Sequence, residues 1–244
     1  MSRPHPSSQS APRTTLHAVL KKLEARADPA VRAAMAHFGV HVEKAHGISM
    51  PVLHKLAKEI GTDHRLAQQL WASGIHEARI LAGLVDDPAK VTAKQMERWA
   101  RDFNAWDLVD GSCAHLFVFA RPAWRKAVEW ARREPEFVRR AGFTLMACLA
   151  VHDKEASDAR FVRLLPIIRR RASDDRNFVK KAVNWALRQI GKRNRRLNRS
   201  AIRTAKQIRS TDAPAARWVA ADALRELTGA AVQRRLAERA RRPA

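Results

Sequence analysis

Hydrophobic residues recur at helical spacing along almost the whole chain from Thr14 onward, and this constrains the fold more than any other feature. In LHAVLKKLEARA (residues 16–27), for example, Leu16, Val19 and Leu23 share one helical face. Tyrosine is absent, only nine glycines occur and β-branched runs are short, so no strand competes with the helices. We therefore expect an all-α protein. Further helical segments, bounded by Gly, Pro or capping residues, are expected at 51–61, 64–74, 76–88, 92–103, 103–115, 122–135, 136–153, 156–174, 177–191, 198–210 and 214–229.

Paired helical segments recur roughly every 35–45 residues, the range of HEAT and armadillo units, without a strict sequence repeat. Such pairs stack into a curved α-solenoid with a concave face. An irregular globular array of helices is the alternative. We expect the HEAT-like solenoid over residues 14–230, with a disordered basic tail at 1–13 and a basic helix or frayed tail at 231–244. Pro166 predicts a kink in the segment 156–174.

The charge balance limits the class of partner. The chain has 47 Lys and Arg against 24 Asp and Glu, a net charge of +23. A globular protein this basic most often binds a polyanion, with nucleic acid first and an anionic membrane surface second. A GC-rich genome, which favours Arg and Ala codons, would also raise the net charge. The basic residues are clustered along the chain, however, which favours the binding of a polyanion. The longest apolar run, 141–151, is too short to span a bilayer, and the first 13 residues lack the apolar core of a secretory signal.

The sequence contains no recognisable metal or nucleotide motif. The two cysteines, Cys113 and Cys148, lie in apolar contexts without a CxxC or Cys/His cluster, so we expect no metal and no cofactor. Buried free thiols suit a reducing cytoplasm, where we expect the protein to lie, associated with a bacterial nucleoid. No Gly-rich phosphate loop, GxSxG or HExxH occurs, and the ten histidines are dispersed, which leaves nucleotide hydrolysis and metalloprotease chemistry without support.

One helical segment carries an unusual pair of side chains. In FNAWDLVDGSCAH (103–115), Trp106 and Asp110 are four residues apart and therefore share a helical face. An indole and a carboxylate on one face fit neither an apolar nor a charged surface. The pair is either a site or an ordinary surface feature, and Asp107 beside it is better explained as a structural or capping acid.

A second tryptophan lies among cations in NFVKKAVNWALRQIGKRNRR (177–196). Lys181, Trp185 and Arg188 share one helical stripe, while Phe178 and other apolar residues can serve the core. A Trp flanked by cations suits a sugar or base with phosphates beside it. Alternatively, Trp185 anchors the core with the cations extended around it.

Two groups of arginines and lysines complete the candidates. The run 191–209 holds eight cations and no acid, which indicates a phosphate-binding stripe or a well-solvated face. Arg139 and Arg140 begin an apolar helix, where adjacent side chains point about 100° apart, so one can face a ligand while the other faces solvent; surface placement of both is the alternative. We expect DNA contacts from Arg139, Arg140, Lys181, Arg188, Lys192, Arg193, Arg195 and Arg196.

The segments AWDLVD, FVRRAGF and FVKKAVNWALR, together with HGISMPVLHKLAKEIG, resemble the AlkD-like DNA alkylation-repair glycosylases, an all-helical family of HEAT-like repeats. The similarity runs from about residue 37 to 228, and the order and separation of the motifs carry it. One departure is Ala105, which stands where the family has another aromatic residue.

The resemblance implies roles for individual residues. Trp106 and Asp110 match the family's W-D-x-V-D segment, Trp185 its later tryptophan, Arg140 its cleft arginine, and Arg188 a basic residue one turn after that tryptophan. The family excises cationic alkylated purines such as 3-methyladenine and 7-methylguanine, contacting the backbone and deoxyribose without drawing the base into a deep pocket, unlike most glycosylases. Branches that lack the Trp or Asp are taken not to cleave, so the presence of both implies activity.

The residue types suit this chemistry. Alkylation makes the base a cationic leaving group that needs no general acid, and bond breaking leaves positive charge on the sugar. A carboxylate stabilises that charge and orients or deprotonates water, indoles hold the sugar, and arginines hold phosphate.

We therefore expect a monomeric glycosylase acting on double-stranded DNA, with Asp110, Trp106 and Trp185 catalytic. A non-catalytic HEAT-repeat binder of DNA or RNA is the main alternative, and a scaffold for an acidic protein is the third.

Overall fold

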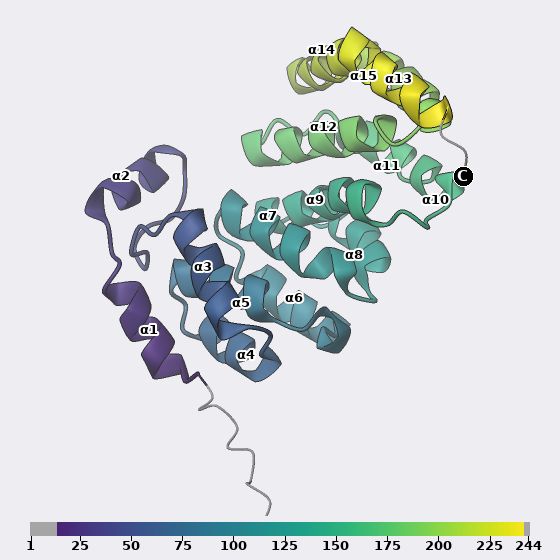
Figure 1. Cartoon of the computed structure of the whole chain (residues 1–244). Coiled ribbons are helices and arrows are strands. Elements are labelled where there is room, and N and C mark those ends of the chain that lie inside the picture. Colours follow the sequence, from purple (N-terminus) through teal and green to yellow (C-terminus); the bar gives the residue numbers. More distant parts are fainter. Residues whose placement is uncertain (1–13, 242–244) are drawn as a thin grey trace, which may run out of the picture.

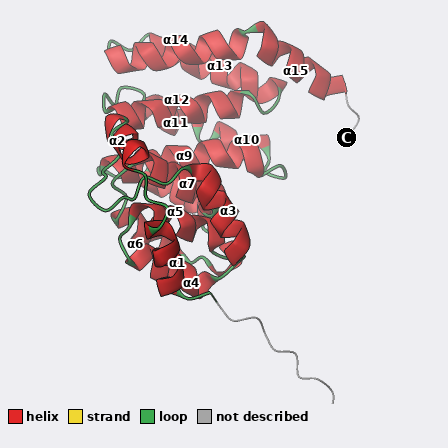
Figure 2. Cartoon of the chain, turned by 60° about the vertical axis from the view of Figure 1, so that its left-hand side comes forward, coloured by secondary structure: helices red, strands yellow, loops and turns green. Residues whose placement is uncertain are grey.

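The computed structural model describes residues 14–241, and every regular element in that range is a helix (Figures 1 and 2). This confirms the all-α prediction. Among these residues, no helix combines the length and hydropathy that crossing a bilayer requires. The predicted N-terminal tail, 1–13, lies outside the described residues. The α-helices are α1 Leu16–Glu24, α2 Pro29–His37, α3 Met50–Ile60, α4 His64–Ala72, α5 His76–Val85, α6 Ala93–Arg101, α7 Trp106–His115, α8 Ala123–Trp130, α9 Glu136–His152, α10 Asp158–Val162, α11 Leu165–Arg171, α12 Asn177–Gly191, α13 Arg195–Arg209, α14 Pro214–Thr228 and α15 Ala230–Arg241.

The helices stack in sequence order as pairs (Figure 1). One row contains α5, α7, α9, α12 and α14, each packed on the next. The helices α4, α8, α11 and α13 pack against α5, α9, α12 and α14, respectively, and together with α6, which contacts α9, they form a second row. The array therefore has the layered form of a solenoid, and the first row carries the candidate site. Short 3₁₀ turns, η1 (Pro88–Lys90) and η2 (Phe117–Phe119), lie in the connections before α6 and after α7.

Local sequence signals set the helix ends. The Thr92 hydroxyl accepts a hydrogen bond from the Gln95 backbone N–H, as the predicted N-cap requires. Gly61 follows α3 with φ of 72°, a left-handed conformation that favours glycine. Pro166 lies in the first turn of α11 and separates it from α10, so the expected kink is a break between two short helices.

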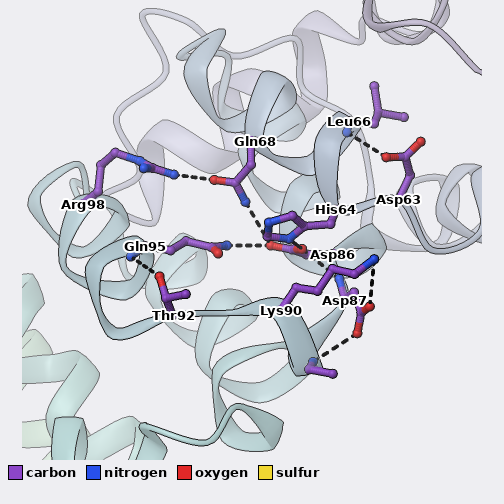
Figure 3. Close-up of polar contacts among 11 residues, drawn as sticks. Asp63, His64, Leu66, Gln68, Asp86, Asp87, Lys90, Thr92, Gln95 and Arg98 are labelled. Atoms are coloured by element: carbon purple, nitrogen blue, oxygen red, sulfur yellow. Dashed lines mark hydrogen bonds and ion pairs between the residues drawn. The ribbon is translucent and has the colours of Figure 1, made fainter.

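A buried carboxylate ties three of the N-terminal helices together (Figure 3). Asp86, just after α5, contacts His64 Nδ1 on α4 at 2.6 Å and accepts hydrogen bonds from Gln68 Nε2 at 3.3 Å and Gln95 Nε2 on α6 at 2.6 Å. Nearby, the Trp71 and Trp99 rings stack with centroids 4.0 Å apart. These contacts fix the second row of helices beside the first.

Helix α2 was not separately predicted. None of its residues is fully buried, in keeping with its Ala-rich sequence PAVRAAMAH, and Met35 packs against the core. The Asp28 carboxylate caps its first turn, and the Arg32 Nε donates to the Val42 carbonyl at 3.1 Å. At the other end of the chain, the alternative of a C-terminal helix is the one seen: α15 runs to Arg241.

Candidate active site and nucleic-acid interface

The carboxylate of Asp110 is held by two side chains of the neighbouring helix α9. Arg140 donates from Nε to Oδ1 at 3.0 Å and from Nη2 to Oδ2 at 2.6 Å. The Thr144 hydroxyl donates to Oδ1 at 3.0 Å. A bidentate guanidinium is among the strongest partners of a carboxylate. Asp110 is thus fixed in position, although 23% of its side chain remains exposed.

Arg140 also connects α9 to α12. Its Nη1 donates to the Phe178 carbonyl at 2.6 Å, and its guanidinium carbon lies 6.0 Å from the centre of the Trp106 ring. The arginine is only 6% exposed. Its position favours a role in orienting Asp110 over the predicted contact with a DNA phosphate.

Trp106 forms one wall of a cleft of about 520 Å³. Its indole N–H donates to the Phe38 carbonyl at 3.1 Å, which joins the start of α7 to the end of α2. Phe38 itself is 66% exposed at this opening. The cleft is lined by His37, Phe38, Gly39, Trp106, Arg140, Asn177, Phe178 and Lys181. It therefore combines aromatic faces with cationic groups, next to the Asp110 carboxylate that Arg140 holds.

The surroundings of Asp110 act on its pKa in opposite directions. Burial raises the pKa above its ordinary value, and the charge and hydrogen bonds of Arg140 and the Thr144 hydroxyl oppose that rise. The nearby Asp107 carboxylate raises it slightly further. The net direction is upward.

Trp185 lies farther along α12 than the cleft. It is seven residues after Phe178, so the two share a helical face about 10 Å apart along the axis. The indole is half-buried and packs against the core. The alternative prediction, that Trp185 anchors the core, therefore holds for the buried part of the ring. The common helical face places it in line with the cleft.

The sequence matches a known protein family over most of its length. A family model described as "DNA alkylation repair enzyme" matches residues 19–227, from α1 to the end of α14. The chain belongs to this family. The resemblance drawn from the motifs around Trp106, Arg140 and Trp185 is confirmed at this level.

A solved structure shares the architecture of this DNA alkylation repair family member. It is described as "A new family of proteins related to the HEAT-like repeat DNA glycosylases with affinity for branched DNA structures". It matches with a TM-score of 0.70 and 22% identity over 80% of this chain and 83% of that one. This likeness shows the HEAT-like repeat fold and confirms the predicted solenoid. Comparison with curated proteins gives no significant match.

Several of the predicted DNA contacts are engaged within the fold of this family member. Arg139 is 3% exposed and is paired with Glu134 at 2.6 Å and Asp174 at 2.7 Å. Its guanidinium therefore stabilises the turn before α9 and the start of α12, and we remove it from the proposed DNA contacts. Arg193 donates to the carbonyls of Ala150, Lys154 and Ala156, so it closes the end of α9 while keeping its charge unneutralised.

Arg188 and Lys192 belong to a ladder between α12 and α14. Arg188 contacts Glu226 at 2.5 Å and Asp222 at 3.4 Å, and Lys192 contacts Glu226 at 2.6 Å. The ladder begins with Lys180, whose Nζ lies 5.1 Å from the Trp218 ring centre, and continues with Asn184, which donates to Asp222. From Lys180 to Arg188, both partners advance by four residues at each step. The acids of α14 therefore neutralise two of the predicted phosphate contacts.

The remaining predicted cations are exposed. Lys181 lies at the cleft, and Arg195 and Arg196 lie in the first turn of α13. None of these three side chains forms an ion pair among the described residues.

Sequence reasoning missed three contributors to the site. Phe178 was assigned to the core and instead lines the cleft. Phe38 and Thr144 were not singled out, because Phe38 ends a helix that carries no strong apolar pattern and Thr144 lies within an apolar run. Asp107 is confirmed as structural, since it accepts from the Leu108 N–H at 2.8 Å and contacts His76 Nε2 at 2.9 Å.

Proposed function

We propose that this protein is a DNA glycosylase that removes cationic alkylated purines, of the 3-methyladenine and 7-methylguanine type, from duplex DNA. The observation that carries the proposal is the pairing of the Asp110 carboxylate with Arg140 at 3.0 and 2.6 Å, because Arg140 also lines the cleft walled by Trp106. Family membership supports DNA repair as the process. The open cleft suits contact with deoxyribose and base edge without deep base flipping.

The proposed reaction hydrolyses the N-glycosidic bond. As the bond between purine nitrogen and C1′ breaks, its electron pair leaves with the base, which thereby loses its positive charge, and the sugar becomes oxocarbenium-like. The Asp110 carboxylate stabilises that charge, and water adds to C1′ and passes its proton through the carboxylate to solvent. Arg140 holds the carboxylate in its ionised form and in one orientation. No cofactor enters this scheme.

The aromatic groups hold the nucleotide in the same scheme. Trp106 offers an indole face to the sugar and the cationic base, and its N–H bond to the Phe38 carbonyl fixes the ring. Trp185 extends the aromatic surface along α12, and exposed Lys181 supplies a phosphate contact at the cleft.

Release of methylated bases from methylated duplex DNA tests the proposal. Wild-type protein is expected to release 3-methyladenine and 7-methylguanine, and Trp106→Ala and Trp185→Ala are expected to reduce release while the proteins stay folded by circular dichroism. A protein that binds the DNA yet releases no base above background would contradict the proposal.

A non-catalytic DNA-binding function is the second candidate. Two observations favour it: both Asp110 oxygens are already occupied by Arg140 and Thr144, and the structural relative is described as having affinity for branched DNA. On this alternative, a four-way junction binds more tightly than a linear duplex of equal length, and Trp106 or Asp110 variants change no reaction. Parallel binding and base-release assays separate the two functions.

We further propose that the protein acts as a monomer in the cytoplasm. The +23 net charge opposes self-association and favours DNA as the partner. Light scattering at low and physiological salt, and localisation of the labelled protein with the bacterial nucleoid, test these points; a stable dimer or a location away from DNA would contradict them.

A further inference from the structure

A large basic cavity lies at the opposite end of α12 from the cleft. Its volume is about 800 Å³, and it is enclosed by the segment after α9, the end of α12, the start of α13 and helix α15. Five cations line it against one carboxylate: Lys154, Lys192, Arg193, Arg235 and Arg239, with Asp158.

Two arginines of this cavity donate hydrogen bonds to backbone carbonyls. Arg193 donates to three backbone carbonyls, and its guanidinium carbon lies 4.5 Å from the centre of the Phe161 ring. Arg239 donates from Nη1 to the carbonyls of Lys192 and Arg193 at 3.2 and 3.3 Å. For Arg193, the carbonyl groups orient the guanidinium without cancelling its charge. The cavity therefore brings several cationic side chains together, and hydrogen bonds to backbone carbonyls fix the position of Arg193 among them.

The carboxylates near the cavity are already engaged. Asp158 Oδ1 accepts from Asn194 Nδ2 at 2.7 Å, and Glu226 is paired with Lys192 and Arg188. Lys154 and Arg235 are exposed, and neither forms an ion pair among the described residues. These two side chains are available to an anion without breaking any recorded contact.

We infer that this cavity binds the phosphodiester backbone of DNA, at a point distant from the damaged nucleotide. The inference rests on the proposed DNA substrate. Phe178 at the cleft and Lys192 at the cavity are fourteen residues apart on α12 and its C-cap, about 21 Å along the axis. At 3.4 Å per base pair, that distance corresponds to about six base pairs. The cavity therefore reads no base and anchors the flanking duplex or a second DNA arm.

The double substitution Lys154→Gln/Arg235→Gln tests the inference. Its matched control is Lys94→Gln/Arg125→Gln, which removes the same two charges from exposed positions on α6 and α8 in the other row of helices. Affinity is measured by fluorescence anisotropy across a salt series, using duplexes of 10 and 24 base pairs with a central lesion. The shorter duplex extends only about 17 Å on each side and ends before the cavity.

For the 24-base-pair duplex, the cavity variant is expected to bind about fivefold more weakly, with a salt slope smaller by about 2. Its affinity for the 10-base-pair duplex is expected to match that of the control. Equal behaviour of the two variants on the longer duplex would overturn the inference, as would equal losses on both duplex lengths.

A titration with inorganic pyrophosphate distinguishes a small phosphorylated ligand from DNA. Tight pyrophosphate binding that the cavity variant loses, together with an unchanged salt slope for DNA, would overturn the assignment to DNA. Base release at saturating 24-base-pair substrate is expected to be unchanged in the cavity variant. If wild-type protein releases no base, the proposed reaction fails, whereas the anisotropy series still decides the cavity's role.

Discussion

Arg140 and Asp110, thirty residues apart in sequence, meet through two hydrogen bonds of 3.0 and 2.6 Å between α9 and α7. The Arg140 side chain is almost entirely buried, whereas 23% of the Asp110 side chain remains exposed. The pair therefore holds a negative charge in a fixed and partly exposed position, as stabilisation of a developing cation requires.

Replacing Asp110 by Asn tests that charge directly. The amide has nearly the same shape but carries no negative charge, so we expect base release to fall by about 10²–10³-fold. DNA affinity should stay within about twofold, because phosphate contacts dominate it. Single-turnover release and anisotropy on one substrate provide the two readouts.

Asp107→Asn is the matched control, since it removes an acid three residues away. Asp107 contacts His76 and the Leu108 N–H, so we expect a lower melting temperature with little change in base release. Full activity in the Asp110 variant, or equal losses in both, would contradict the role given to Asp110.

The pH dependence of the chemical step follows from the raised pKa of Asp110. Burial raises it above 3.8, with Arg140 and Thr144 opposing that rise. Only the ionised carboxylate stabilises the sugar cation, so the single-turnover rate should fall as pH decreases through a value above 3.8. An acid limb centred at or below 3.8 would show that another group controls the rate.

Acid should destabilise the fold through carboxylates whose pKa is lowered. Burial raises the pKa of both Glu97 and Glu226. Lys126 and Trp130 more than offset this effect at Glu97. Lys192 and Arg188 do so at Glu226. A lowered pKa in the folded state contributes stability above the unfolded value of 4.5, and that contribution is lost as pH falls through the lower folded value.

We therefore expect the melting temperature to decline below about pH 4.5. Glu226→Gln should have a lower melting temperature at pH 7 and a shallower decline in acid, because it has no charge to lose. A variant with the wild-type acid profile would indicate that the α12–α14 ladder contributes no net stability. Scanning calorimetry from pH 7 to pH 3 supplies the comparison.

Two glycines should respond oppositely to substitution by alanine. A Cβ on Gly142 of α9 would overlap the Ala131 backbone of the preceding turn, so we expect a loss of about 1–3 kcal/mol. Gly111 on α7 has open space around its Cβ position, and alanine there should stabilise the helix by about 0.5–1 kcal/mol. Urea unfolding of both variants measures the effects; similar shifts would contradict this account of the α8–α9 contact.

The two thiols should be unreactive in the folded protein. Burial raises the pKa of Cys148 to about 12 and that of Cys113 well above its usual value. Ellman's reagent at pH 8 should therefore label neither thiol until guanidinium unfolds the chain, after which both should react. Rapid labelling under native conditions would show that the core around α7 and α9 opens readily.

The sequence predicted the helices because their apolar spacing is local, and the caps at Thr92 and Gly61 because each acts within one turn. It also identified the Trp106–Asp110 pair, whose members share a helix. The partners of charged groups were not predictable in this way. Arg139 and Arg140 look equivalent in sequence, but tertiary packing directs one to Asp174 and the other to Asp110.

The cation run that begins at Lys192 shows the same limit. The composition of the run predicts a positively charged surface. The acids that neutralise Lys192, and Arg188 just before the run, lie on α14, more than thirty residues away in sequence. Phe38 was missed for a related reason: its place at the cleft depends on the contact between α2 and α7, where the Trp106 indole N–H donates to the Phe38 carbonyl.

In the ladder between α12 and α14, the acidic side chains of α14 act as counterions for cations at the end of α12. A cation that contacts a DNA phosphate releases a counterion condensed on the DNA, but Arg188 and Lys192 are already paired with Asp222 and Glu226. DNA bound near this ladder would therefore release fewer counterions than the row of positive side chains implies. The net charge of +23 thus overstates the number of cations that are available to phosphate.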